Sequence, residues 1–341
     1  MTIVAGELHE VQRAGTRIER VLRPASWSAA LEMLQDHPGA RPVAGGTDLV
    51  LDLARTAGDP VTLVDLSGVA GAHEIVESDG ELVLGGGVTH NQVVADPRFR
   101  ERALPLAQAC LEIGSPQLRN RATLAGNVAT ASPANDSISA LMALGAGLVL
   151  SRRVGDTLVD RDVPVADVFT GFRATVLEPD ELITAIRVPQ LGERERGLWV
   201  KLGLRRAQAI SVVHAGLVVG LDPDGVVTTA RLALGSVAPT VVLSEPFAAT
   251  LVGRPLDADA ITAAADAVAD RIEPIDDVRG TADYRRAVTR TLVERSLQTL
   301  AAGRQAERWP ADPPRLGVRT PSGPPPRVEV DDTTPIAVTV N

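Results

Sequence analysis

Cysteine is nearly absent from this sequence, because Cys110 is the only one among 341 residues. A single cysteine excludes an internal disulfide, a four-cysteine zinc site and an iron–sulfur cluster held by this chain alone. Cys110 has apolar neighbours on both sides, so we expect it to be a small core residue rather than a nucleophile. The five histidines show no pairing at a metal-binding spacing, and the sequence therefore predicts no metal site.

Aromatic residues are also scarce, and there is no excess of positive charge. Aromatic residues make up 2% of the chain and all hydrophobic residues 45%, so alanine, valine, leucine and isoleucine must build the core. Little aromatic surface is left for stacking on bases. The net charge of −9 opposes binding to nucleic acid or to an anionic membrane over a broad surface.

The sequence contains no apolar run long enough for a membrane span. The stretch from Ile138 to Leu150 is the longest that is nearly uncharged, and it is too short to cross a bilayer. Glu7 and Glu10 stand where a signal peptide needs its apolar segment. We therefore expect a cytoplasmic protein without a membrane span.

Lysine is almost absent as well. Of the 34 basic residues only Lys201 is a lysine, and all the others are arginine. A compact ammonium and a planar guanidinium are not interchangeable, which makes Lys201 a candidate functional residue. The survival of one lysine by chance in an arginine-biased sequence explains the pattern equally well.

Two short glycine-bearing stretches are candidate ligand loops, and they read Ala44-Gly45-Gly46-Thr47-Asp48 and Thr123-Leu124-Ala125-Gly126-Asn127. Glycine permits positive φ angles and lets a ligand approach the main chain closely. Successive exposed N–H groups in such turns form a concave anion site. Two such loops predict a diphosphate held from both sides, although neither matches a known mononucleotide or dinucleotide fingerprint.

Up to about residue 190 the pattern predicts alternating helices and strands. The helix that begins after Ser26 is expected to bury one face, formed by Ala29, Ala30, Met33 and Leu34. Thr89 and Gln92 are expected to form a capping box at the start of a further helix. Other helices are expected at 104–113 and 138–144, a hairpin at 74–77 and 82–85, and strands at 61–66, 147–151, 158–159 and 180–189.

The pattern changes after about residue 193. Three antiparallel strands are expected at 198–204, 212–221 and 226–234, followed by alanine-rich helices at 258–272 and 284–301. We expect domains at 20–190 and 193–305, and a proline-rich linker and tail at 310–341. The last residues look like the first strand of a [2Fe–2S] domain, and a disordered tail is the alternative.

Five motifs occur in order and at suitable spacings between about residues 20 and 305. They are Val43-Ala44-Gly45-Gly46-Thr47-Asp48-Leu49, Thr123-Leu124-Ala125-Gly126-Asn127, Thr130-Ala131-Ser132-Pro133, Phe169-Thr170-Gly171-Phe172-Arg173 and Arg205-Arg206-Ala207-Gln208-Ala209-Ile210. Together they resemble the FAD-binding subunit, or FAD domain, of the molybdenum hydroxylases, which include xanthine dehydrogenase and aerobic carbon monoxide dehydrogenase. In that family the second motif more often has glycine where this chain has Ala125.

The resemblance implies an α+β protein. Its first part would be a PCMH-type, or vanillyl-alcohol-oxidase-type, FAD-binding domain of two α/β subdomains, and an antiparallel sheet packed with helices would follow. FAD would be bound non-covalently, because no histidine lies in the glycine loops. By position, the implied cofactor-binding residues are Val43, Ala44, Gly45, Gly46, Thr47, Asp48, Leu49, Ile113, Thr123, Leu124, Ala125, Gly126, Asn127, Asp136, Ile183 and Lys201.

The resemblance also implies a role for several of these residues. The FAD pyrophosphate would lie between the two glycine loops, and Asp136 would contact the cofactor. Ile113 and Ile183 would pack on FAD, with Ile183 beside the flavin ring. Lys201 would lie near the isoalloxazine and favour the reduced, anionic flavin, which favours the functional interpretation of the only lysine.

The implied partners are a large subunit with the molybdenum cofactor and a small subunit with [2Fe–2S] clusters, arranged as a dimer of heterotrimers. Electrons would pass from the clusters through FAD to NAD, oxygen, a quinone or another carrier. Two alternatives remain at this point. One is a stand-alone flavin oxidoreductase of the same fold, and the other is a flavin-free assembly protein without catalytic activity.

Overall fold

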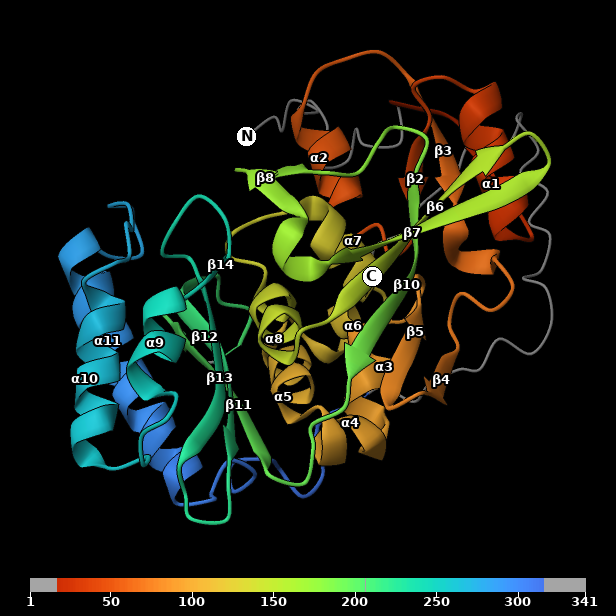
Figure 1. The fold of residues 1–341 in the computed structure, drawn as a ribbon. Helices are drawn as coiled ribbons and strands as arrows, with labels where there is room; N and C mark the ends of the chain where they lie inside the picture. The colour runs from red at the N-terminus through yellow and green to blue at the C-terminus, as the bar shows by residue number, and fades with distance from the viewer. Residues whose placement is uncertain (1–16, 206, 316–341) are drawn as a thin grey trace, which may run out of the picture.

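The computed structural model describes residues 17–205 and 207–315. The predicted resemblance of the tail to a [2Fe–2S] domain lies outside the described residues. We refer to the elements from β1 to β10 as the N-terminal unit and to those from β11 to α11 as the C-terminal unit (Figure 1).

The N-terminal unit begins with a small parallel sheet. Its strands β1 (Ile18–Leu22), β3 (Val61–Asp65) and β2 (Arg41–Val43) lie in that order, and they are joined through helices α1 (Trp27–Asp36) and α2 (Leu49–Arg55). The predicted N-cap is confirmed, since the Ser26 side chain accepts a hydrogen bond from the Ala29 N–H. The predicted buried face is shifted: Ala30, Leu31 and Leu34 are buried, because these residues pack against β3 and the start of β10.

A larger antiparallel sheet follows, in the order β4-β5-β10-β6-β7. Its strands are β4 (Ile75–Ser78), β5 (Glu81–Gly85), β10 (Leu182–Pro189), β6 (Gly147–Val154) and β7 (Thr157–Pro164). The helices of this part are α3 (His90–Ala95), α4 (Pro97–Arg102), α5 (Leu104–Glu112), α6 (Pro116–Arg119), α7 (Leu124–Thr130) and α8 (Asp136–Leu144). The capping box of Thr89 and Gln92 is confirmed at the start of α3, and a short hairpin joins β8 (Phe169–Gly171) to β9 (Ala174–Thr175).

The C-terminal unit is a four-stranded antiparallel sheet covered by helices on its outer face (Figure 1). Its strands are β11 (Glu195–Gly203), β12 (Ser211–Leu221), β13 (Val227–Gly235) and β14 (Val242–Leu243). Its helices are α9 (Glu245–Leu251), α10 (Ala258–Ala269) and α11 (Ala282–Ala301). The predicted meander and its two long helices are confirmed, and α9 was not predicted.

Strand β12 is buried between helices that cover both faces of its sheet. Ten of its eleven residues are buried, because α9 to α11 cover one face of the sheet and α5 and α8 cover the other (Figure 1). Successive side chains of a strand point to opposite faces. Val213 and Ala215 therefore join the core beneath the outer helices, whereas His214 points towards α8. Two sheets and the helices between them thus share one continuous interior.

After α11 the chain returns to the N-terminal unit. The side-chain amide of Gln108 donates to the Gln305 carbonyl at 2.9 Å, and Arg119 donates to the Pro314 carbonyl at 2.7 Å. Trp309 packs against the larger core of the N-terminal unit. No helix among the described residues is both long and apolar enough to cross a membrane.

The contact between α8 and β12 requires glycine at one position. A Cβ atom at Gly216 would lie 2.5 Å from the main-chain oxygen of Ser139, on the helix that packs against the strand. We predict that Gly216→Ala lowers the free energy of unfolding by about 1–3 kcal/mol, because the helix must move away from the sheet. Chemical denaturation measures this change.

The matched control is Gly147→Ala, also in a strand, where the nearest atom to a new Cβ lies 3.8 Å away. It should leave stability nearly unchanged. Equal destabilisation by the two substitutions would contradict the proposed close packing at Gly216.

Candidate cofactor site

A cleft of about 490 Å³ lies where the loop after β2 faces the start of α7. Both glycine-bearing stretches contribute to its wall, so the structure brings these two distant segments of the chain together. The lining residues are Arg41, Pro42, Val43, Ala44, Gly45, Gly46, Thr47, Asp48, Leu49, Leu51, Asp52, Arg55, Ala122, Thr123, Gly126, Asn127, Ala129, Thr130 and Arg173.

The first glycine stretch forms one wall of this cleft. A Cβ atom at Gly45 would lie 2.2 Å from the Arg121 carbonyl oxygen, so only glycine allows the main chain here to touch the segment just before the second stretch. Gly46 has a φ of +73°, in the left-handed region that favours glycine. Among the described residues, the main-chain N–H groups of residues 45–48 donate to no other group. Four successive free donors suit an anionic ligand.

The second glycine stretch is the beginning of helix α7, and the prediction of a loop is wrong here. Thr123 is the N-cap, and its hydroxyl accepts a hydrogen bond from the Gly126 N–H at 3.0 Å. The Asn127 N–H donates to the Thr123 carbonyl. Most donors of this stretch are therefore already used inside the protein. Leu124 and Ala125 point into the core, and Thr123, Gly126 and Asn127 line the cleft.

Three arginines that were not among the predicted site residues also line the cleft. Arg41 pairs with Asp52 at 3.1 Å, whereas Arg55 and Arg173 have no carboxylate partner among the described residues. Arg173 lies at the tip of the β8–β9 hairpin, with its guanidinium carbon 6.0 Å from the centre of the Phe172 ring. In the sequence, the motif Phe169–Arg173 was the only signal for Arg173. Arg41 and Arg55 had no such signal, because only the fold brings them to the cleft.

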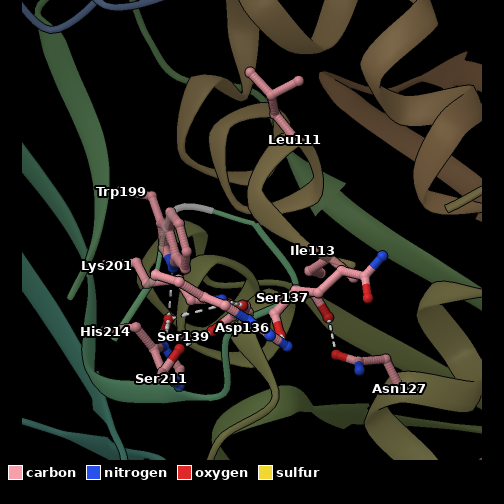
Figure 2. A network of polar contacts seen from close by, with 12 residues as sticks. Leu111, Ile113, Asn127, Asp136, Ser137, Ser139, Trp199, Lys201, Ser211 and His214 are labelled. Carbon is pink, nitrogen blue, oxygen red and sulfur yellow. Dashed lines mark hydrogen bonds and ion pairs between the residues drawn. The ribbon is translucent and has the colours of Figure 1, made fainter. Parts of the chain in front are cut away.

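A second polar site lies where α8 meets the C-terminal sheet (Figure 2). Asp136 is the first residue of α8, and its carboxylate accepts from the Lys201 ammonium at 2.6 Å and from the Ser211 hydroxyl at 2.5 Å. The side chains of Asp136 and Lys201 are only 7% and 9% exposed. Asp136 and Lys201 were each predicted from the family resemblance to contact the cofactor. In the structure they form one buried ion pair between the two units.

Behind this ion pair lies a chain of three buried side chains (Figure 2). The Trp199 indole donates to the Ser139 hydroxyl at 2.9 Å, and that hydroxyl lies 2.7 Å from Nδ1 of His214. Nε2 of His214 lies 3.2 Å from the Pro133 carbonyl, which can only accept. Nε2 therefore carries the proton and Nδ1 accepts from Ser139. Burial lowers the pKa of His214, consistent with a neutral ring.

The two predicted apolar contacts lie outside the residues that line the cleft. Ile113 is the C-cap of α5 and is half-buried, and its carbonyl accepts from Arg119 at 3.3 Å. Ile183 lies on β10, next to an irregularity in the pairing with β6, and is part of the larger core. Their contact with a cofactor stays a prediction.

Cys110 is fully buried in α5, which confirms its prediction as a core residue. Its sulfur lies 3.4 Å from Nδ1 of His90, which is also fully buried. Burial raises the pKa of the Cys110 thiol, so it remains protonated and unreactive. Burial, together with the nearby Arg119, lowers the pKa of His90 to about 3.

Comparison with known proteins identifies the family. Residues 15–191 match the family model of the FAD binding domain in molybdopterin dehydrogenase, and residues 200–300 match that of the CO dehydrogenase flavoprotein C-terminal domain. The chain belongs to the FAD-binding subunits of the molybdenum hydroxylases. It is thus a component of an oxidoreductase, and its family places it in multi-chain complexes.

Several curated relatives match this chain over most of their length. The carbon monoxide dehydrogenase medium chain of Hydrogenophaga pseudoflava is 32% identical, with 80% of this chain and 94% of the relative covered. The putative xanthine dehydrogenase FAD-binding subunit of Escherichia coli is 29% identical, with coverage of 82% and 95%. The nicotinate dehydrogenase FAD-subunit of Eubacterium barkeri is 29% identical, with coverage of 75% and 86%.

Solved structures confirm the predicted fold class. A chain of carbon monoxide dehydrogenase from Hydrogenophaga pseudoflava superposes with a TM-score of 0.78 at 30% identity, covering 85% of this chain and 98% of the other. A chain of quinoline 2-oxidoreductase from Pseudomonas putida 86 gives 0.76 at 27% identity, covering 84% and 98%. The α+β arrangement of an FAD-binding domain and an antiparallel-sheet domain is therefore shared.

The buried His90 makes stability dependent on pH. The unfolded chain binds a proton at this residue near pH 6.5 and the folded chain only near pH 3. We therefore predict that stability is fully present above pH 6.5 and falls towards pH 3, by up to about 1.4 kcal/mol per pH unit. Urea denaturation of the wild type and of His90→Gln at several pH values measures this slope. In His90→Gln the slope of stability against pH should be smaller by the contribution of one proton. An identical slope in both proteins would refute the assignment.

Proposed function

We propose that this chain binds FAD non-covalently and passes electrons from [2Fe–2S] clusters of a partner chain to an external acceptor. The one cysteine among these 341 residues cannot hold a cluster, so the proposed clusters lie outside this sequence. The proposed partners are a molybdenum-cofactor large subunit and a [2Fe–2S] small subunit in a dimer of heterotrimers. The names of the relatives, medium chain and FAD-subunit, support this division.

The observation that carries the proposal is the meeting of the two glycine stretches in one cleft. The free N–H groups of residues 45–48 supply donors for a diphosphate, and close main-chain contact at Gly45 holds them in place. Arg55 and Arg173 add positive charge without a competing carboxylate among the described residues. These groups fit the diphosphate of FAD, and no histidine or cysteine is among the residues that line the cleft.

We further propose that the flavin end of FAD lies towards Lys201, Asp136, Ile113 and Ile183. When bound, FAD supplies the ability to accept an electron pair and to release electrons one at a time. Lys201 would stabilise negative charge on the reduced ring, and Asp136 would hold the ammonium in position through the contact at 2.6 Å. Ile113 and Ile183 would exclude water from the ring.

Gly45→Ala tests the diphosphate cleft. The new Cβ would lie 2.2 Å from the Arg121 carbonyl oxygen and push the first loop away from the segment that precedes α7. We predict that FAD affinity falls by about 5- to 150-fold, since strain of this kind costs about 1–3 kcal/mol. Flavin absorbance of the purified chain and a titration of the apoprotein with FAD measure the loss.

Gly68→Ala is the matched control, because nothing lies within 4 Å of a Cβ atom at that position. It should retain full FAD affinity. A Gly45→Ala protein that purifies with a complete flavin complement would contradict the cleft assignment. A wild type that stays colourless after incubation with FAD and removal of the excess would favour a flavin-free assembly protein.

Lys201→Met tests the electrostatic role. Loss of the ammonium leaves Asp136 buried without its cation, so we predict a loss of about 3–5 kcal/mol in stability. In the FAD-bound chain the flavin reduction potential should fall, because a carboxylate without its counter-ion disfavours the reduced anion. Redox titration measures this potential.

The double variant Lys201→Met with Asp136→Asn separates the two effects. It removes both charges, so most of the stability should return and the potential should lie between those of the wild type and of Lys201→Met. An unchanged potential in the single variant would exclude an electrostatic role for Lys201.

A further inference from the structure

Asn127 connects the cleft to helix α8. Asn127 is one of the residues that line the cleft, and its Oδ1 accepts a hydrogen bond from the Ser137 hydroxyl at 2.5 Å (Figure 2). Its main-chain carbonyl accepts from the side-chain amide of Asn135 at 2.7 Å. The residue is therefore held at both its main chain and its side chain.

In the structure the Ser137 hydroxyl is the donor and Oδ1 the acceptor, and this pairing sets the direction of the Asn127 carboxamide. A carboxamide has one accepting oxygen and one NH₂ group that only donates. Because Oδ1 is bound to Ser137, the NH₂ group lies on the other side, and among the described residues it donates to no other group. The reverse orientation would present an oxygen to the cleft and repel an anionic ligand.

Ser137 is itself held by its surroundings. It is 0% exposed, and it is the second residue of α8, next to Asp136. The carboxylate of Asp136 is bound by Lys201 and Ser211 of the C-terminal unit. The position of the Ser137 hydroxyl is thus set by the contact between the two units as well as by its own helix.

We propose that Ser137 is a positioning residue, whose hydroxyl orients the Asn127 carboxamide so that its NH₂ group donates to the diphosphate of FAD. This assignment rests on the proposed function, because it takes the ligand of the cleft to be FAD. Ser137 does not touch the ligand in this account, and it acts only through Asn127.

A double-mutant cycle in FAD affinity tests this role. The apo form of the full chain is titrated with FAD for the wild type, Ser137→Ala, Asn127→Ala and the double variant. A hydrogen bond to a charged group predicts a loss of about 10- to 100-fold for Asn127→Ala. Ser137→Ala should lose about 3- to 10-fold, since only the orientation is lost. The double variant should bind as Asn127→Ala does, and Ser137→Thr, which keeps the hydroxyl, should restore affinity.

Ser151→Ala is the matched control. Ser151 is also a buried serine, and its hydroxyl contacts Asp160 and Thr184 in the large sheet. Its removal should leave FAD affinity unchanged. Thermal unfolding of each apoprotein shows whether the variants are folded. If Ser137→Ala does not fold, Ser137→Cys, which keeps the volume but donates poorly, takes its place in the cycle.

The outcomes separate this assignment from the proposed function. Wild-type affinity in Ser137→Ala, or an equal loss from that substitution when residue 127 is already alanine, would overturn the positioning role while FAD binding stands. Failure of the wild type to bind FAD would overturn the proposed function and this assignment with it. Non-additive losses, together with recovery in Ser137→Thr, support the assignment.

Discussion

The ion pair between Asp136 and Lys201 is the contact on which the arrangement of the two units depends. Both charges are almost completely removed from water, which is unfavourable unless each is neutralised and hydrogen-bonded. Asp136 meets this condition through Lys201, through Ser211 and through its place in the first turn of α8, where the helix dipole favours a negative charge. Removal of either partner from the closed interface would leave the other charge buried without its counter-ion.

The geometry of this pair also explains why the only lysine of the chain is found here. The ammonium binds one carboxylate oxygen of Asp136 and leaves the other to the Ser211 hydroxyl. An arginine favours both oxygens of a carboxylate at once, and its planar group would compete with Ser211. Lys201 also lies opposite His214 in the strand register, where α8 packs against the sheet.

Local sequence patterns predicted much of the fold, because they report local physics. The cap at Ser26, the box at Thr89 and Gln92 and the strands of the C-terminal meander depend on side chains a few residues apart. The motif at 123–127 misled, since glycine and asparagine are typical of loops, whereas the hydroxyl of Thr123 caps a helix there. The face of α1 was shifted because its neighbours across the core decide which side is buried.

The candidate site was predicted only in part, for the same reason. The glycine stretches and Lys201 stand out in the sequence, as a short motif and as a rare residue. The contact between Asp136 and Lys201 joins distant segments, and nothing local in either segment indicates it. Arg41 and Arg55 look like ordinary surface arginines until the fold brings them to the cleft. Tertiary contact, rather than propensity, selects these residues.

The segment that follows α11 restrains how the molecule can open. It is anchored to the N-terminal unit through the Gln305 carbonyl, the Trp309 side chain and the Pro314 carbonyl. The C-terminal unit is therefore connected to the N-terminal unit at both of its ends, by the connection from β10 and by this returning segment. A rigid-body opening of the two units would therefore have to break the hydrogen bonds of this returning segment. The residues that line the cleft all belong to the N-terminal unit, so entry of a ligand does not require the two units to separate.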